Sequence, residues 1–361
     1  MDKGKYKKLN NYHVIFLING AMTGLGALYL SRDLSPMGYN QWVMLLIFGI
    51  VANIAIIPMI KLGLKYPSNN LFEINEKLLG KLLGKIVNII IIIYGILIVI
   101  TVSKGYLTLL QITLLTNREI IIPFFFLLGV MIYIVTGGIK LVARFCIIGF
   151  FFTIWIMFTA WWSITTGTTS HIFPLFNFTL KEAAKAFHSG FTSLMGFELI
   201  MFYFPYIIKQ EKVFKYTTIG IWITIPVYIV GVFSCTVYLS PWQLENIKFP
   251  LLTLMKAIEF SFIERLENII VAFWVFLILS TTVAYLWMTK KGIDVLLGKI
   301  KTMHLYVSVF IIAIFPLLPI PIKIEKFLLE ELHIYIGYGV ILLPVLLLLI
   351  HKLRSTGGKL E

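Results

Sequence analysis

Charged residues are scarce in this chain. Asp, Glu, Lys and Arg make up 13% of its 361 residues, whereas a soluble globular domain has about 25%. Hydrophobic residues reach 59%, above the roughly 45–50% of a soluble domain. This balance excludes a soluble protein and predicts an integral membrane protein, in which chain length measures the number of spans.

Cysteines and catalytic motifs are also rare. The two cysteines, Cys146 and Cys235, fall within apolar runs, where we expect them to fill space and not to form a disulfide. The six histidines show no metal-ligand spacing, and the sequence holds no phosphate-binding loop, nucleophile elbow or HExxH motif. We therefore expect no enzyme, no metal site and no cofactor.

Apolar runs fill most of the chain. Clusters of Lys, Pro, Gly or Asn separate them at about 12–31, 41–61, 86–115, 120–136, 144–166, 186–208, 216–239, 266–289, 303–319 and 334–351. Since a helix needs about 20 apolar residues to cross the hydrocarbon core, the sequence predicts an all-α domain with ten transmembrane helices. Two matching halves, about 12–166 and about 186–351, each open with a run that glycine interrupts.

Basic residues outnumber acidic ones by 31 to 17. If the N-terminus is cytoplasmic, 21 basic residues fall on the inner side and 9 on the outer side, with Lys104 inside a span. The positive-inside rule then places both termini in the cytoplasm. Because no alternation of aromatic and basic residues suggests a nucleic-acid surface, the charge reports topology and contact with anionic lipids.

The first run contains Gly20, Gly24 and Gly26 near its centre. Glycine weakens a helix there and frees backbone groups that lipid cannot satisfy, so such a break is expected only where it lines a cavity. Freed N–H groups at Thr23, Gly24, Leu25 and Gly26 would attract a substrate carboxylate. The alternative is close helix packing through small residues.

The sixth run is broken in the same way at Gly196. Freed carbonyls around Ser193, Leu194 and Met195 would suit a substrate ammonium. Glu198 is the one acidic residue deep within a predicted span, and it could bind that ammonium, take up a proton or pair with a lysine. In the last case it would only fix helix packing.

Span three carries a polar stripe of Tyr94, Thr101, Lys104, Thr108 and Gln111 at helical spacing. We expect the stripe to face the bundle interior, because polar groups avoid lipid. A lysine within a span is by default a functional candidate, and Lys104 could pair with the acidic residue of the sixth run. The alternative is a lysine that extends to the interface or belongs to a structural network.

Span eight holds three adjacent hydroxyl residues, Ser280, Thr281 and Thr282. Such side chains commonly bond back to their own helix.

The outer loop at 240–265 is long enough to have structure, and it carries Glu245, Glu259 and Glu264 beside an apolar face. It is interpreted as an interfacial helix, or alternatively as a lid or a partner-docking surface.

Short motifs follow one another along nearly the whole chain: Tyr66-Pro67 with Glu73 and Gly80-Lys81, Tyr133 through Gly137-Gly138, Val142-Ala143-Arg144, Phe173-Pro174-Leu175, Gly196-Phe197-Glu198, Phe204-Pro205 and Glu264-Arg265-Leu266-Glu267. In this order they resemble the spore germination receptor B subunit, the GerAB-type permease family of the amino acid–polyamine–organocation superfamily.

The resemblance implies a five-plus-five inverted repeat of the leucine-transporter type. In sodium-coupled relatives of this fold, hydroxyls on the eighth span help to hold a cation against the first break, so the resemblance makes Ser280, Thr281 and Thr282 a candidate cation site. It further implies a place in the spore inner membrane and partnership with an A subunit and a C subunit. A small nutrient, with an amino acid expected, would bind between the broken first and sixth spans, lined by the third and eighth. Two hypotheses stay open: a receptor subunit that senses the nutrient and signals germination, and a proton-coupled amino-acid permease.

Overall fold

The computed structural model describes residues 8–116, 118–258 and 265–356. Its α-helices are α1 (Asn11–Met22), α2 (Gly26–Asp33), α3 (Gln41–Lys65), α4 (Leu71–Leu79), α5 (Lys81–Thr113), α6 (Ile121–Thr136), α7 (Gly138–Thr153), α8 (Ala160–Thr166), α9 (Leu180–Gly190), α10 (Ile200–Tyr203), α11 (Val213–Tyr238), α12 (Pro241–Asn246), α13 (Pro250–Ala257), α14 (Leu266–Leu296), α15 (Met303–Ile314), α16 (Ile322–Lys326) and α17 (His333–Thr356).

Short 3₁₀ helices join several of these: η1 (Ser35–Asn40), η2 (Ile154–Thr159), η3 (Thr169–Ile172), η4 (Phe191–Leu194), η5 (Phe197–Leu199), η6 (Phe204–Tyr206), η7 (Gln210–Lys212) and η8 (Phe315–Leu317). The segment η9 (Phe327–Leu332) is a π-helix. Among the described residues, the β pairing is limited to one isolated bridge between Leu9 and Ile207.

Within the described ranges, six helical segments are long and apolar enough to cross a membrane, or up to seven if α1 and α2 count as one bent span. The helices α6 and α15 are apolar but shorter, and the sixth predicted run is divided among several short helices. The all-α membrane architecture is therefore present, while the number of ten spans stays a prediction.

Several predicted boundaries move. The fifth run begins at Gly138, before its predicted start near 144, and changes to a 3₁₀ helix at Ile154–Thr159 before continuing as α8. The last run begins with α16, well before its predicted start near 334. Among the outer-loop acids, Glu259 and Glu264 lie outside the described residues.

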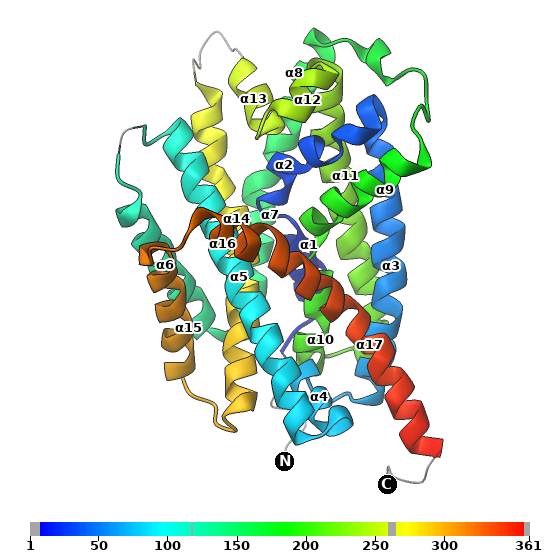
Figure 1. Ribbon diagram of the computed structural model, residues 1–361, viewed down its shortest axis with the longest axis vertical. Coiled ribbons are helices and arrows are strands. Elements are labelled where there is room, and N and C mark those ends of the chain that lie inside the picture. The colour runs from blue at the N-terminus through cyan, green and yellow to red at the C-terminus, as the bar shows by residue number, and fades with distance from the viewer. Residues whose placement is uncertain (1–7, 117, 259–264, 357–361) are drawn as a thin grey trace.

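The first span is broken where the glycines predicted it. The axes of α1 and α2 differ by 55° across the break at 23–25, and Thr23 leaves the helical conformation there. The sixth run is broken between η4 and η5, where Gly196 has a φ of 135° that side-chain-bearing residues rarely adopt. Both breaks lie midway along the bundle (Figure 1).

The two breaks pack directly on one another. A Cβ at Gly196 would lie 2.6 Å from the carbonyl group of Ala21, and a Cβ at Gly26 would lie 2.7 Å from the Ser193 carbonyl oxygen. Only glycine permits this backbone approach, so the glycines that weaken the helices also let the breaks meet. Around them, α14 packs against α5 and α7, and α1 packs against α11 and α7.

The first and last described residues lie at the same end of the bundle, beside α4 (Figure 1). Lys8 donates its N–H to the Tyr206 carbonyl at 2.8 Å, and Arg354 donates to the Lys77 carbonyl at 3.2 Å. The outer-loop helices α12 and α13 lie at the opposite end. There α13 contacts α2, α11 and α14, and its residues Leu252 and Met255 are buried, so this helix is packed into the bundle.

Candidate functional site

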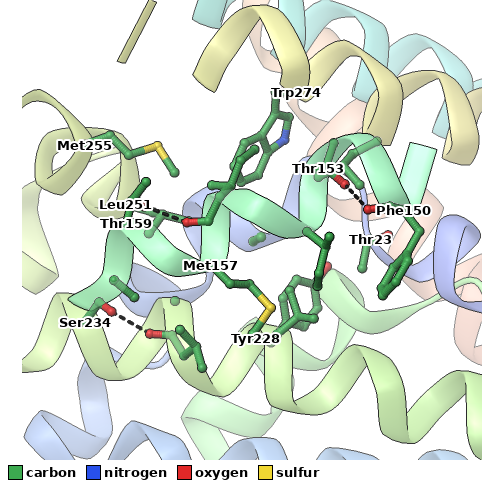
Figure 2. Close-up of a pocket in the computed structure, with 18 of the residues that line it drawn as sticks. Thr23, Phe150, Thr153, Met157, Thr159, Tyr228, Ser234, Leu251, Met255 and Trp274 are labelled. Carbon is green, nitrogen blue, oxygen red and sulfur yellow. Dashed lines mark hydrogen bonds between the residues drawn. The ribbon is translucent and has the colours of Figure 1, made fainter. Parts of the chain in front are cut away.

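A cavity opens beside the first break. It offers about 80 Å³ to the centres of water-sized spheres, enough for several waters or a small organic group. Its walls come from the α1–α2 break, the α7–η2–α8 segment, α11, α13 and α14 (Figure 2). The cavity thus lies where the straight path of the first span is interrupted.

The polar side-chain groups of the cavity are hydroxyls, one amide and the indole N–H of Trp274, which is buried without a hydrogen-bond partner among the described residues. Thr153 and Ser234 each donate to a carbonyl of their own helix at 2.7 Å, as does Thr23. Asn19 donates from its amide to the Thr224 hydroxyl at 2.9 Å. No Asp, Glu, Lys or Arg lines the cavity among the residues that the structure describes, so the site suits a ligand without net charge.

The amino end of α2 meets this cavity through Gly24 and Ala27. The first N–H groups of a helix have no partner within the helix, and together they carry a partial positive charge. A carboxylate could therefore be held here by backbone groups alone. The carboxylate site that the glycine spacing predicts at 23–26 stays a prediction.

The remaining lining is apolar. Met157, Leu251, Met255 and Trp274 surround the space between α8, α13 and α14, and Met157 extends toward the ring of Tyr228 in Figure 2. A ligand with a polar head and an apolar side chain matches this division.

Tyr228 of α11 links the cavity wall to both breaks. Its hydroxyl donates to the Met22 carbonyl at 2.8 Å and to the Ser193 carbonyl at 3.2 Å. Both acceptors lie at helix interruptions, where carbonyls lack helical partners.

The structure places two of the predicted first-break residues, Thr23 and Gly24, in the cavity wall. The others pack against neighbouring helices. Gly20 approaches Cys146 of α7, Leu25 fills the space beside Gly105 of α5, and Gly26 faces Ser193.

The predicted sixth-break residues Ser193, Leu194, Met195 and Gly196 do not line this cavity. Leu194 is fully buried, and the Ser193 carbonyl is occupied by a tyrosine hydroxyl. The backbones of the two breaks pack against one another, and of the two breaks only the first contributes residues to this cavity. The predicted pocket between the breaks stays a prediction.

Glu198 is fully buried, but its partners differ from the predicted lysine. Tyr94 of α5 and Tyr285 of α14 donate to its Oε1 at 2.8 and 2.5 Å, and the Gly196 N–H donates to its Oε2 at 2.7 Å. The carboxylate thus joins three segments through uncharged donors. Its predicted pairing with Lys104 is wrong.

Lys104 instead forms an ion pair with Glu325 of α16, and both side chains are partly exposed. The stripe turns with the helix. Thr101 donates to the Leu329 carbonyl at 3.3 Å inside the π-helix η9, and Thr108 bonds back to the Lys104 carbonyl at 3.0 Å. Of the five residues in the stripe, only Tyr94 is fully buried in the interior. The carboxylate that pairs with Lys104 comes from α16, a segment that the sequence did not place next to the third span.

The three hydroxyls of α14 have protein acceptors. Ser280 and Thr282 bond back to Phe276 and Ile278 carbonyls. Thr281 crosses to the first break and donates to the Gly20 carbonyl at 3.0 Å. A cation between Thr281 and the break would have to displace that hydrogen bond, and the cation site stays a prediction.

Sequence reasoning missed two tyrosines, Tyr228, which lines the cavity, and Tyr285, which donates to the Glu198 carboxylate. Aromatic residues make up 15% of the chain, so neither stood out. The fifth-span contribution of Met157 was missed as well, because an apolar run gives no sign of the 3₁₀ segment that turns this residue inward.

This fold is similar to that of known transporters. MhsT in complex with L-phenylalanine matches with a TM-score of 0.67 and 16% identity, covering 92% of this chain and 88% of that one. Mhp1, a nucleobase-cation-symport-1 family transporter with bromovinylhydantoin bound, matches with a TM-score of 0.58 and 9% identity, over 90% and 75% of the two chains. The class is therefore a membrane protein with the inverted-repeat, leucine-transporter type of fold.

The family follows from the sequence. Residues 8–323 match the family described as spore germination protein, and the chain belongs to that family. Spore germination protein GerQB of Bacillus cereus is 29% identical over 292 residues, 81% of each chain. Spore germination protein A2 of Bacillus subtilis (strain 168) is 25% identical over 324 residues, 86% of this chain and 87% of that one. The resemblance drawn from the short motifs is confirmed.

Proposed function

We propose that this protein is the membrane subunit of a spore nutrient-germinant receptor and that it binds an amino acid with an apolar side chain. The observation that carries the proposal is the cavity, where the amino end of α2 meets an uncharged and largely apolar lining. A carboxylate would lie at Gly24 and Ala27, and the apolar side chain would point to Met157 and Leu251.

The relatives support the germination context, since their names describe spore germination proteins. The fold neighbour MhsT holds L-phenylalanine, which supports an amino acid as the ligand class. In the proposed arrangement the protein lies in the spore inner membrane with both termini in the cytoplasm, beside A and C partner subunits. The two repeats, about 12–166 and 186–351, would move relative to one another when the ligand binds.

A ligand can shift such an equilibrium only by binding one arrangement more tightly than the other. A receptor subunit would pass the shift to its partners and so signal germination. The second candidate, a proton-coupled amino-acid permease, would use the same shift for alternating access. The observation that favours the permease is the buried carboxylate of Glu198, which joins the break at Gly196 to α5 and α14.

The test is uptake of radiolabelled amino acids into liposomes that contain the purified protein, with and without an imposed proton gradient. Equilibrium binding is measured on the same preparation. Saturable binding without accumulation is the expected result. Accumulation driven by the gradient would contradict the receptor proposal and support the proton-coupled permease. A Thr23→Val, Ser234→Ala variant removes two cavity hydroxyls and should weaken binding, whereas Ser355→Ala, exposed near the end of α17, serves as the matched control.

A further inference from the structure

Tyr228 is the one described cavity residue whose side chain hydrogen bonds to both broken segments. The Met22 carbonyl ends α1 in the first half of the chain, and the Ser193 carbonyl lies in η4 of the second half. A single phenolic proton is shared between these two acceptors. The ring of the same residue forms part of the cavity wall.

Apart from this hydrogen bond, the two breaks meet through close backbone contacts and through apolar side chains. Gly26 lies against Ser193, and Gly196 lies against Ala21 and Met22. Met22, Leu194 and Met195 belong to one hydrophobic cluster. Apolar contacts have no preferred direction, so a directional hydrogen bond has a large influence on the relative position of the two segments.

The helix that carries Tyr228 contains a proline. Pro226 lies inside α11 and lacks the N–H that would bond to the Trp222 carbonyl. This loss weakens the helix two residues before the tyrosine. A small displacement of the Tyr228 ring is therefore cheaper here than in a helix with all of its backbone hydrogen bonds.

We propose that Tyr228 is a positioning residue that couples occupancy of the cavity to the relative position of the two breaks. The inference rests on the proposed function for the identity of the ligand. The two hydrogen bonds from the Tyr228 hydroxyl to Met22 and Ser193 are called the latch. In the unliganded protein the shared phenolic proton holds Met22 and Ser193 together. An entering carboxylate is a stronger acceptor than a backbone carbonyl, so the Tyr228 hydroxyl keeps its proton, donates its hydrogen bond to the carboxylate and releases both carbonyls.

This exchange gives the ligand a different interaction energy in the two arrangements, which a population shift requires. The ligand gains a hydrogen bond to Tyr228 only where the latch is open. Without the hydroxyl, the open arrangement should be populated before any ligand arrives.

The experiment uses Cys146 as a reporter. This buried thiol lies beside Gly20 of α1, so its alkylation by N-ethylmaleimide measures opening around the first break. Cys235→Ala provides a background with one thiol. Tyr228→Phe keeps the ring and removes the hydroxyl, and Tyr203→Phe is the matched control, because the buried Tyr203 hydroxyl has no partner among the described residues.

In the absence of ligand, Tyr228→Phe should be alkylated roughly fivefold faster than the background, as expected for loss of one net hydrogen bond. Tyr203→Phe should match the background. L-leucine and L-phenylalanine, tested in parallel, should accelerate the background but not Tyr228→Phe, while the dissociation constant of Tyr228→Phe changes by less than about fivefold. A merely structural residue would lower affinity and thermal stability together and would leave the ligand response in place.

Alkylation of Tyr228→Phe at the background rate, with a normal acceleration by amino acid, would overturn the latch. If neither amino acid binds the background protein, the proposed ligand fails, yet the ligand-free rates still decide whether the latch exists. Should Tyr228→Phe not fold, hydrogen exchange of the unaltered protein replaces it. Faster exchange at both 23–28 and 193–199 on adding amino acid supports the coupling, and a change at one segment alone refutes it.

Discussion

At the scale of single residues, the region of the two breaks depends on glycines, which have no side chain, as well as on the side chains around them. Gly26 and Gly196 let two interrupted helices touch through their backbones. The sequence revealed these positions because glycine is unusual at the centre of an apolar run. The tyrosines that complete the site were not predictable, since the direction of a ring depends on how its helix is rotated in the bundle.

Gly196→Ala should destabilise the protein and abolish its response to ligand. The residue has a φ of 135°, and a Cβ would lie 2.6 Å from the Ala21 backbone. Left-handed backbone costs about 1–2 kcal/mol for other residues, and overpacking adds about 1–3 kcal/mol. Thermal unfolding in detergent measures the loss. Gly129→Ala is the control, because no atom lies within 4 Å of its Cβ position and it should be neutral or slightly stabilising. Equal midpoints for both variants would contradict the packing of the breaks.

Double-mutant cycles should distinguish the ion pair in the structure from the predicted one. Lys104 contacts Glu325, and both are partly exposed, so their coupling energy should be no more than about 1 kcal/mol and should fall with salt. Lys104→Met and Glu198→Gln should instead be additive within about 0.5 kcal/mol, because their side chains have different partners. The unfolding midpoints of single and double variants are compared. A strong coupling between Lys104 and Glu198 would show that the two residues meet.

At the scale of helices, long apolar runs located most of the elements. Because the runs are continuously apolar, they gave no sign of changes in helix type within them. The fifth run holds a 3₁₀ segment that contributes Met157 to the cavity, and the last run begins with α16 and a π-helix. Both features depend on contacts between distant segments, such as the bond from Thr101 to the Leu329 carbonyl. The outer loop was interpreted as an interfacial helix or a lid, and α13 forms a wall of the cavity.

Shortening the apolar wall should change ligand preference. Met157→Ala and Leu251→Ala enlarge the end of the cavity between α8 and α13, so larger apolar amino acids should bind better relative to smaller ones. Each additional methylene that enters the new space should improve relative affinity by about fourfold, the equivalent of roughly 0.8 kcal/mol. Competition binding with L-alanine, L-leucine and L-phenylalanine measures the ranking. Met303→Ala, exposed on α15, should leave the ranking unchanged. An unchanged ranking in both cavity variants would place the ligand elsewhere.

At the scale of the whole molecule, the fold explains how one chain can suit two mechanisms. Two broken segments meet at the middle of the bundle, and the cavity touches one of them while Tyr228 touches both. The sequence predicted the pair of breaks from the glycines at the centres of two apolar runs. It could not predict where the cavity would open, because that depends on how tightly the breaks pack.

The orientation of the chain in the membrane can be tested with lysines at the two ends of the bundle. The chain enters α13 and leaves α14 at opposite ends of the bundle (Figure 1). Lys248 precedes α13, Lys299 follows α14, and both are exposed. The positive-inside rule places Lys299 in the cytoplasm and Lys248 outside. In a background without native cysteines, Lys248→Cys should react with a membrane-impermeant maleimide in intact cells, and Lys299→Cys should react only after permeabilisation. Cys146 and Cys235 are both buried, so their replacement by Ala should not disturb the surface. Labelling of Lys299→Cys alone in intact cells would show that the topology is the reverse of the predicted one. The cavity wall formed by α13 would then lie on the cytoplasmic side, where an external nutrient could not reach it first.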